Sequence, residues 1–267
     1  MRDPALPDNA TAHDRHPEEA HALNVEGTKN VALAAARLKT KLVYYSTDYI
    51  FDGRAGPYSE EDEPAPINVY GQTKLKAEKI IQELCPTWLI VRTTAVFGWD
   101  KESRNFAMQV WKRLNAGEPM RVPTDQWGNP TLADYLAEVS VRLIEINAQG
   151  IFNVVGKERM PRSEFAKALA KALALDPNLI LPVPTRELGQ IAPRPLQGGL
   201  KTEKLKQTLE TEPISLEEAL KRFKRQWQMD THITRASGVV SKEGEELKRE
   251  ILDKVRRYFR VVHEPRR

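Results

Sequence analysis

Apolar positions along the first 155 residues alternate between two periods, which predicts helices separated by buried strands. Residues 18–38 place Leu23, Val31 and Leu38 at helical spacing among several alanines, so we expect a helix there. Residues 41–46 form a short apolar run rich in β-forming residues, which is typical of a strand buried on both faces. The same reasoning predicts helices at 69–84, 103–115 and 132–147 and strands at 88–92 and 151–155. Strands alternating with helices of this length indicate an α/β fold with a parallel sheet.

The remaining segments follow looser patterns. Residues 1–17 are polar and show no apolar period, and residues 51–68 form a loop rich in glycine and proline. After residue 156 we expect a smaller lobe, 156–230, with helices at 162–173, 202–209 and 215–228 and a proline-rich stretch at 176–195. Residues 231–241 are interpreted as a linker. Beyond it, one face of a last amphipathic helix is lined by Leu247, Ile251, Val255 and Phe259.

Composition restricts the class of protein. The chain of 267 residues has no apolar run near the ~20 residues that cross a bilayer and no signal peptide at its first residues, so we expect a cytoplasmic protein without membrane contact. Its single cysteine, Cys85, cannot form an internal disulfide. The net charge is +4, but residues 229–267 hold ten Lys/Arg and seven Asp/Glu, which leaves 31 and 30 for the rest. The body is therefore nearly neutral, and no nucleic-acid partner is expected.

Tyr70 and Lys74 are the first candidates for chemistry, because residues four apart share a helix face. A neighbouring ammonium favours ionisation of a phenol, so such a pair can give or take a proton. The alternative is a surface tyrosine beside a solvated lysine. Thr47 favours the first interpretation, since it follows the strand at 41–46, and ligands of parallel sheets bind outside the carboxyl ends of strands.

Four ordered motifs extend this pattern: NVEGTKN at 24–30, YSTDYIFDG at 45–53, PAPINVYGQTKL at 64–75 and RTTAVFG at 92–98. In order and spacing they resemble the extended short-chain dehydrogenase/reductases. Within that superfamily the chain most resembles the dTDP-4-dehydrorhamnose reductases and the related regulatory β subunits of methionine adenosyltransferase. Segments 105–107, 124–131 and 192–205 strengthen the resemblance, which covers about residues 17–228.

The resemblance implies a catalytic and cofactor-binding group. Tyr70 would give a proton to a keto oxygen as hydride arrives from NADP or NAD, and Thr47 would orient that carbonyl. Lys74 would lower the pKa of the phenol and, with Tyr70, hold the nicotinamide ribose. Asn24 would support the site or relay protons, or is simply a polar helix residue near the sheet.

A second implied group would bind a nucleotide-sugar substrate. Gln126 and Trp127 match part of a substrate loop. Arg194 matches a position that grips the diphosphate, for which a planar guanidinium is well suited. The alternative for Arg194 is a solvated loop arginine.

One part of the family pattern is absent. The sequence contains no G-x-G-x-x-G or G-x-x-G-x-x-G motif for a cofactor pyrophosphate. We therefore expect residues 1–155 to be an N-terminally truncated dinucleotide-binding domain with a partial Rossmann-like sheet. The strand at 41–46 would then present an open edge.

Two functions stay open from sequence alone. Intact Thr47, Tyr70 and Lys74 favour an NAD(P)H-dependent reductase of a nucleotide-sugar 4-keto group. The missing glycine motif favours a non-catalytic regulatory or binding subunit. The last helix is expected to dock on its own lobe or to pair with a second copy as a homodimer. No metal site is expected, because His13, His16 and His21 have no convergent carboxylates beside them.

Overall fold

The computed structural model describes residues 9–100, 102 and 105–235. The chain divides into two compact units, Met1–Phe223 and Lys224–Arg267, and the described part of the second is the end of one helix. The expected boundary near residue 155 stays a prediction, and the expected helix beyond residue 241 lies outside the described residues. No helix in the described ranges combines the length and apolarity needed to cross a membrane.

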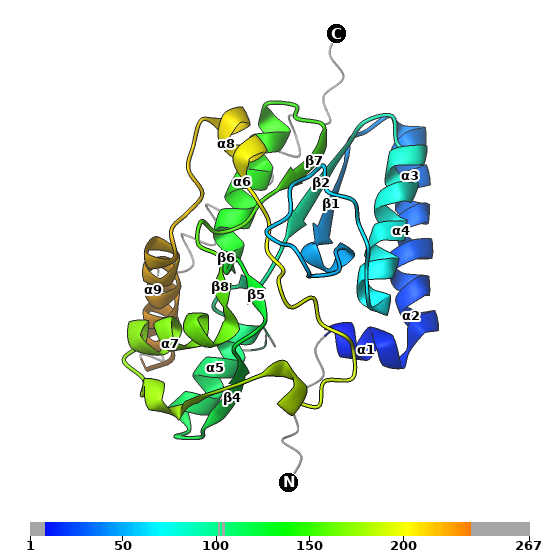
Figure 1. Cartoon of the computed structure of the whole chain (residues 1–267). Coiled ribbons are helices and arrows are strands. Elements are labelled where there is room, and N and C mark those ends of the chain that lie inside the picture. Colours follow the sequence, from blue (N-terminus) through cyan, green and yellow to red (C-terminus); the bar gives the residue numbers. More distant parts are fainter. Residues whose placement is uncertain (1–8, 101, 103–104, 236–267) are drawn as a thin grey trace. The chain divides into compact units, whose positions relative to one another are not determined.

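The elements follow the expected helix–strand alternation through the first 155 residues (Figure 1). The helices are α1 (Asn9–Arg15), α2 (Pro17–His21), α3 (Gly27–Leu38), α4 (Val69–Leu84), α5 (Phe106–Asn115), α6 (Ala133–Glu145), α7 (Arg162–Ala172), α8 (Glu203–Leu209) and α9 (Leu216–Arg235). The strands are β1 (Leu42–Thr47), β2 (Trp88–Thr93), β3 (Val96–Phe97), β4 (Met120–Pro123), β5 (Trp127–Gly128), β6 (Thr131–Leu132), β7 (Gly150–Asn153), β8 (Met160–Pro161) and β9 (Ile180–Val183).

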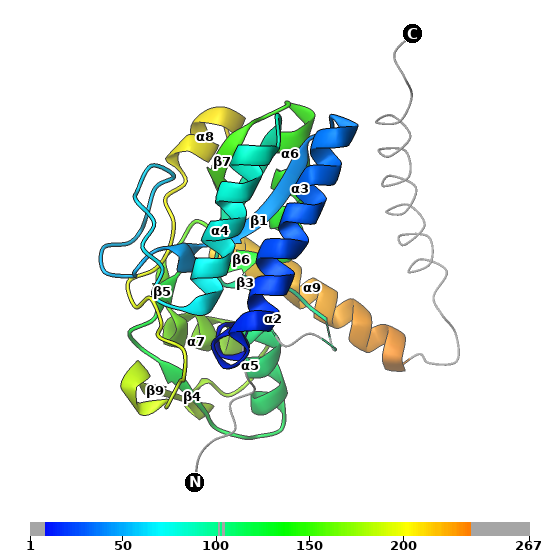
Figure 2. The same ribbon diagram turned by 90° about the vertical axis from the view of Figure 1, so that its right-hand side faces the viewer.

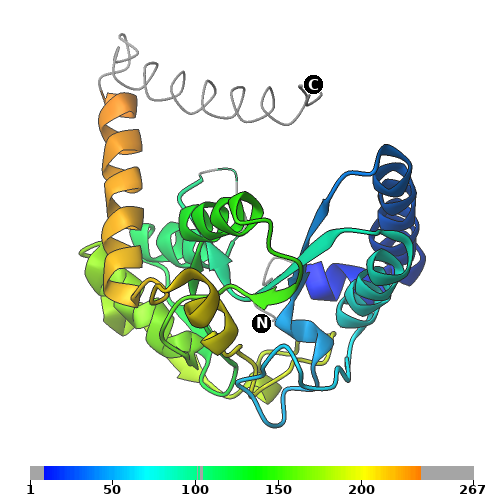
Figure 3. The same cartoon turned by 90° about the horizontal axis from the view of Figure 1, so that it is seen from above.

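A parallel three-stranded sheet in the order β1-β2-β7 forms the centre of the first unit. Helices α3 and α4 cover one face, where Ala32, Ala35, Ile81 and Ile90 are buried together. Figure 3 shows α6 on the opposite side of this sheet. The predicted α/β class with a parallel sheet is confirmed.

Helices α2 and α3 are joined by a π-helical turn, Ala22–Glu26, and run as one continuous rod beside α4 (Figure 2). The helix predicted at 18–38 is thus confirmed, but its buried face is not the one that Leu23, Val31 and Leu38 suggested. These three side chains are 72%, 54% and 76% exposed, whereas Ala32 and Ala35 are buried. Small side chains face inward because they let α3 approach α4 closely.

The strand predicted to be buried on both faces is only half covered. In β1, Leu42, Val43 and Tyr44 are half-buried and Tyr45 is 45% exposed. The reason is topological: β1 is the edge strand of its sheet and pairs within the described chain only with β2.

Two other expectations were wrong in part, and the proline-rich stretch contains a strand that the sequence did not predict. Residues 9–15 form α1 rather than irregular chain, and its Asp14 accepts a hydrogen bond of 2.9 Å from the Val69 backbone N–H. Helix α9 continues through residues 231–235, into the predicted linker, because no glycine or proline stops it there. Strand β9 lies inside the proline-rich stretch and pairs in parallel with β4.

Candidate active site

The N-terminus of α4 is fixed against the end of β1. Asn68 caps the helix by accepting a hydrogen bond of 2.8 Å from the Gly71 N–H, and its own amide donates to the Pro193 carbonyl at 2.9 Å. A Cβ at position 71 would overlap the Tyr49 carbonyl oxygen, so only glycine allows this close approach. Tyr70 is consequently held beside the segment that follows β1.

Thr47 and Tyr70, which are 23 positions apart in the sequence, are brought together here. The Tyr70 hydroxyl and the Thr47 side chain form a hydrogen bond. Burial raises the pKa of Tyr70 to about 12, despite the opposing effect of that bond. The expectation of a lowered phenol pKa is therefore wrong for this structure, because removal of the phenolate from water outweighs the favourable contacts.

Lys74 lies one helical turn beyond Tyr70 on the same face of α4. Its Nζ donates to the Tyr45 carbonyl at 2.6 Å and sits 4.2 Å from the centre of the Tyr44 ring. Burial lowers the pKa of Lys74 to about 8, and the Glu78 carboxylate opposes that fall. The solvated-lysine alternative does not describe this residue.

His13 was not considered for catalysis, yet it lies directly on Tyr70. The two rings stack with centroids 5.3 Å apart, and burial, followed by the charge of Lys74, lowers the pKa of His13. The signal was hidden because α1 has no apolar period of its own. The stacking and the effect of the Lys74 charge together place this imidazole beside both Tyr70 and Lys74.

Tyr49 and Asp48 were also missed as site residues, although they follow Thr47 directly in the quoted motif. The Tyr49 ring meets Tyr70 edge-on at 5.8 Å. Asp48 is 3% exposed, accepts a hydrogen bond of 3.2 Å from the Gly199 N–H, and burial raises its pKa to about 6. Asp48 thereby ties the loop of residues 194–200 to the site.

Arg194 reaches the same cluster from that loop. Its Nη1 lies 3.5 Å from the Tyr49 hydroxyl and its guanidinium is 6.0 Å from the Tyr49 ring centre. At 7% exposure it is not a solvated loop arginine. The structure therefore places it near Tyr70 through Tyr49.

Gln126 and Trp127 occupy a different position, at β5. The amide nitrogen of Gln126 donates to Thr185 at 3.0 Å and to Gln190 at 2.7 Å, so both of its hydrogens serve the 185–190 loop. Trp127 donates its backbone N–H to the Leu196 carbonyl at 2.8 Å, and Arg159 lies 4.9 Å from its ring centre. The two residues support the loops that lead to Arg194.

Asn24 contacts the first turn of α4 through Thr73. It lies in the π-helical turn, and its amide donates to the Thr73 hydroxyl at 3.0 Å. That hydroxyl donates in turn to the Tyr70 carbonyl at 2.9 Å. Asn24 therefore fixes the first turn of α4. No cluster of three metal-ligating side chains occurs among the residues described.

A protein-family comparison matches residues 7–229 to the family described as RmlD substrate binding domain. The dTDP-4-dehydrorhamnose reductase of Escherichia coli is 33% identical over 216 residues, which span 74% of this chain and 72% of that protein. The methionine adenosyltransferase 2 subunit beta of Danio rerio is 34% identical over 199 residues, which span 72% of this chain and 61% of that protein.

Comparison with solved structures indicates the same family. The dTDP-4-dehydrorhamnose reductase of Bacillus anthracis, determined in complex with NADP, superposes with a TM-score of 0.78 at 32% identity. The match covers 82% of this chain and 78% of that one. The resemblance inferred from the motifs is confirmed.

Proposed function

Because the chain belongs to the RmlD substrate-binding-domain family, we propose that it is a reductase of the short-chain dehydrogenase/reductase type that acts on the 4-keto group of a nucleotide-linked sugar. The observation that supports this most directly is the meeting of Thr47, Tyr70 and Lys74 at the carboxyl end of β1. This group contains a proton donor, a carbonyl-orienting hydroxyl and a cation.

The chemistry of this reduction needs a hydride and a proton, and a bound nicotinamide supplies the hydride. Tyr70 supplies the proton to the keto oxygen. Its raised pKa keeps the phenol protonated at neutral pH, which is the form that can donate. Thr47 donates a hydrogen bond to the same oxygen and so fixes its distance from Tyr70.

The described residues fit the nicotinamide end of NADP or NAD. An ammonium has three N–H donors, and Lys74 gives one to the Tyr45 carbonyl, so two can serve ribose hydroxyls. Tyr70 lies one turn away on the same face. These two residues would hold the ribose. The B. anthracis relative contains NADP, which favours that nucleotide for this chain.

The substrate side is assigned to the loops. Arg194 would bind the diphosphate, because its fork of donors matches phosphate oxygens. Gln126 and Trp127 would shape the sugar pocket through the 185–190 and 194–200 loops. A diphosphate at Arg194 would compete with the weak contact to the Tyr49 hydroxyl.

Tyr70→Phe tests the proposal. With NADPH and dTDP-4-dehydrorhamnose, we expect this variant to lose about 10²–10⁴-fold in kcat, because the donor proton is gone while the ring is retained. Absorbance of NADPH at constant substrate measures the loss. Tyr135→Phe is the matched control, since its hydroxyl bonds at Ile214, in another part of the unit. Equal activity of Tyr70→Phe and the wild type would reject the assignment.

A second candidate is a non-catalytic regulatory subunit. The observation that favours it is the 34% identity to a methionine adenosyltransferase 2 subunit beta, which is as high as the identity to the reductases. A folded chain that binds NADPH but oxidises none of it with the keto sugar would support this candidate over the reductase.

A further inference from the structure

A third ionisable residue continues the face of α4 that holds Tyr70 and Lys74. Glu78 follows Lys74 by four positions, so the three side chains succeed one another at one-turn intervals. Glu78 is fully buried, at 0% exposure. A carboxylate in that position is costly unless its charge is compensated.

Arg92 of β2 compensates it. Its Nε donates to one Glu78 oxygen at 3.1 Å and its Nη2 to the other at 2.7 Å, and the two side chains are only 3% and 1% exposed. Arg92 also donates to the Glu60 carbonyl at 3.3 Å and stacks on Phe51 at 5.5 Å. Both partners are therefore held in one orientation, and the Glu78 carboxylate cannot turn toward water.

Lys74 has no ion pair of its own within the described chain, although it is partly buried. The charge of its ammonium is partly compensated by the dipole of the Tyr45 carbonyl and by the ring of Tyr44. The groups that face it come from three elements: His13 from α1, Tyr44 and the Tyr45 carbonyl from β1, and Tyr70 and Glu78 from α4 itself. Of these groups only Glu78 carries a carboxyl group, and Arg92 of β2 donates to both of its oxygens.

We propose that the Glu78–Arg92 pair is a positioning device for Lys74: Arg92 fixes the Glu78 carboxylate one turn beyond the lysine, where it keeps the ammonium charged and directed at the active site. In catalysis, which rests on the proposed function, Glu78 acts through Lys74 and touches neither substrate nor cofactor. Arg92 holds the carboxylate in place by donating to both of its oxygens.

The physical reason is a balance of two effects on one ammonium. Burial disfavours the charged form and lowers the pKa of Lys74 to about 8, close to neutral, while Glu78 raises it. Without Glu78 a larger fraction of Lys74 would be neutral at pH 7. A neutral Lys74 amine could still donate to the Tyr45 carbonyl, but it would no longer supply a positive charge to the active site.

Competitive acylation of lysines with acetic anhydride over pH 6–10, read by mass spectrometry, measures the pKa of Lys74 without cofactor or substrate. In Glu78→Gln we expect that pKa to fall by about 1 unit. Glu78→Leu/Arg92→Met removes both charges and keeps the volume, so it should fold even where Glu78→Gln does not. We expect the same direction of shift there. Glu83→Gln, an exposed carboxylate on the same helix, is the control and should leave Lys74 unchanged.

An unchanged Lys74 pKa in a folded variant that lacks the Glu78 charge would overturn the proposal, and so would an equal shift in Glu83→Gln. Steady-state kinetics give the second readout. The high-pH limb of kcat/KM should move down by the same amount in the Glu78 variants, which mere loss of stability would not produce. A shift in acylation without reductase activity in the wild type would keep the positioning role and reject the proposed function instead.

Discussion

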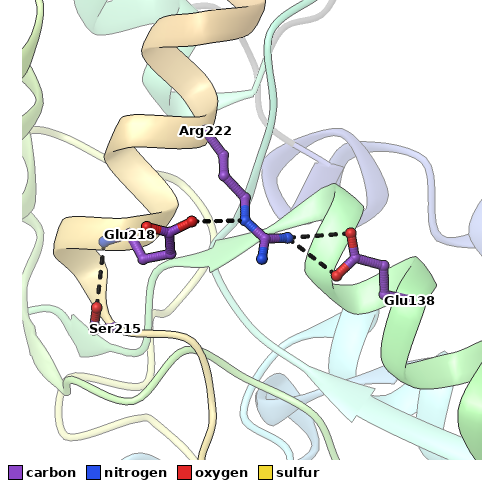
Figure 4. Close-up of polar contacts among 4 residues, drawn as sticks. All are labelled: Glu138, Ser215, Glu218 and Arg222. Atoms are coloured by element: carbon purple, nitrogen blue, oxygen red, sulfur yellow. Dashed lines mark hydrogen bonds and ion pairs between the residues drawn. The ribbon is translucent and has the colours of Figure 1, made fainter. Parts of the chain in front are cut away.

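Arg92 and Arg222, both in the first unit, each bind carboxylates, but they differ in their exposure to water. Arg92 binds both oxygens of Glu78 between a strand and a helix, and both partners are out of water. Arg222 of α9 donates to both oxygens of Glu138 on α6, at 3.0 and 3.1 Å, and to Glu218 on its own helix at 3.1 Å (Figure 4). These three side chains are 37% to 57% exposed.

Exposure decides what each cluster contributes. Around Arg222 water screens the charges, and long side chains lose entropy when they are held, so such contacts contribute little. Around Arg92 water is excluded, and loss of either partner leaves a charge that nothing solvates. The number of hydrogen bonds is therefore a poor guide: Arg222 makes three to carboxylates and Arg92 makes two, but of these two arginines it is Arg92 that adjoins the candidate active site.

Arg92→Ala should have the largest effect on stability. We expect a loss of about 3–5 kcal/mol in the free energy of unfolding, because Glu78 would be left buried and unpaired. Urea denaturation at pH 7 followed by circular dichroism measures it. A loss below ~1 kcal/mol would show that Glu78 finds water or a proton, and would remove the contrast with Arg222.

Asp48→Asn should have an intermediate, pH-dependent effect. Burial raises the pKa of Asp48 from 3.8 to about 6, so between these values the folded protein keeps a proton that the unfolded chain has lost. The stability that this proton contributes is complete below about pH 4 and is lost as the pH rises through 6. The amide side chain of the variant does not titrate.

We therefore expect the stability of Asp48→Asn relative to wild type to increase by on the order of 2 kcal/mol between pH 4 and pH 7. Urea midpoints at both pH values test this. A difference that does not change with pH would mean that hydrogen bonds from Gly199 and Thr94 hold the carboxylate charged.

Arg222→Ala should have the smallest effect, a loss of about 0–1 kcal/mol. In 1 M NaCl this loss should shrink further, because exposed charges are screened over ~3 Å, whereas the loss in Arg92→Ala should not change. Paired urea titrations at low and high salt compare the two. A salt-independent loss at Arg222 would show that its packing on α6, rather than its charge, fixes α9.

Much of the fold could be predicted from local pattern. The predicted bounds agree with the observed ones to within about one residue for the strands at 41–46 and 88–92 and the helix at 69–84. The reason is that the strand and helix periods are visible in consecutive residues. The predictions were wrong where contacts between residues far apart in the sequence determine the structure. Alanines rather than Leu23 and Val31 face the core because α3 packs on α4, and residues 9–15 are helical where Asp14 meets the start of α4.

The sequence by itself determined the family and predicted Thr47, Tyr70 and Lys74 as residues of the candidate active site, because residue type and spacing indicate the chemistry that a helix face and a strand end can present. Only the tertiary structure decided what surrounds them. These surroundings involve residues 14 to 57 positions apart in the sequence. His13 stacks on Tyr70 and Arg92 binds Glu78, while burial raises the pKa of Tyr70 and lowers the pKa of Lys74. Solvent exclusion depends on all the packed elements at once, so no local pattern can specify it.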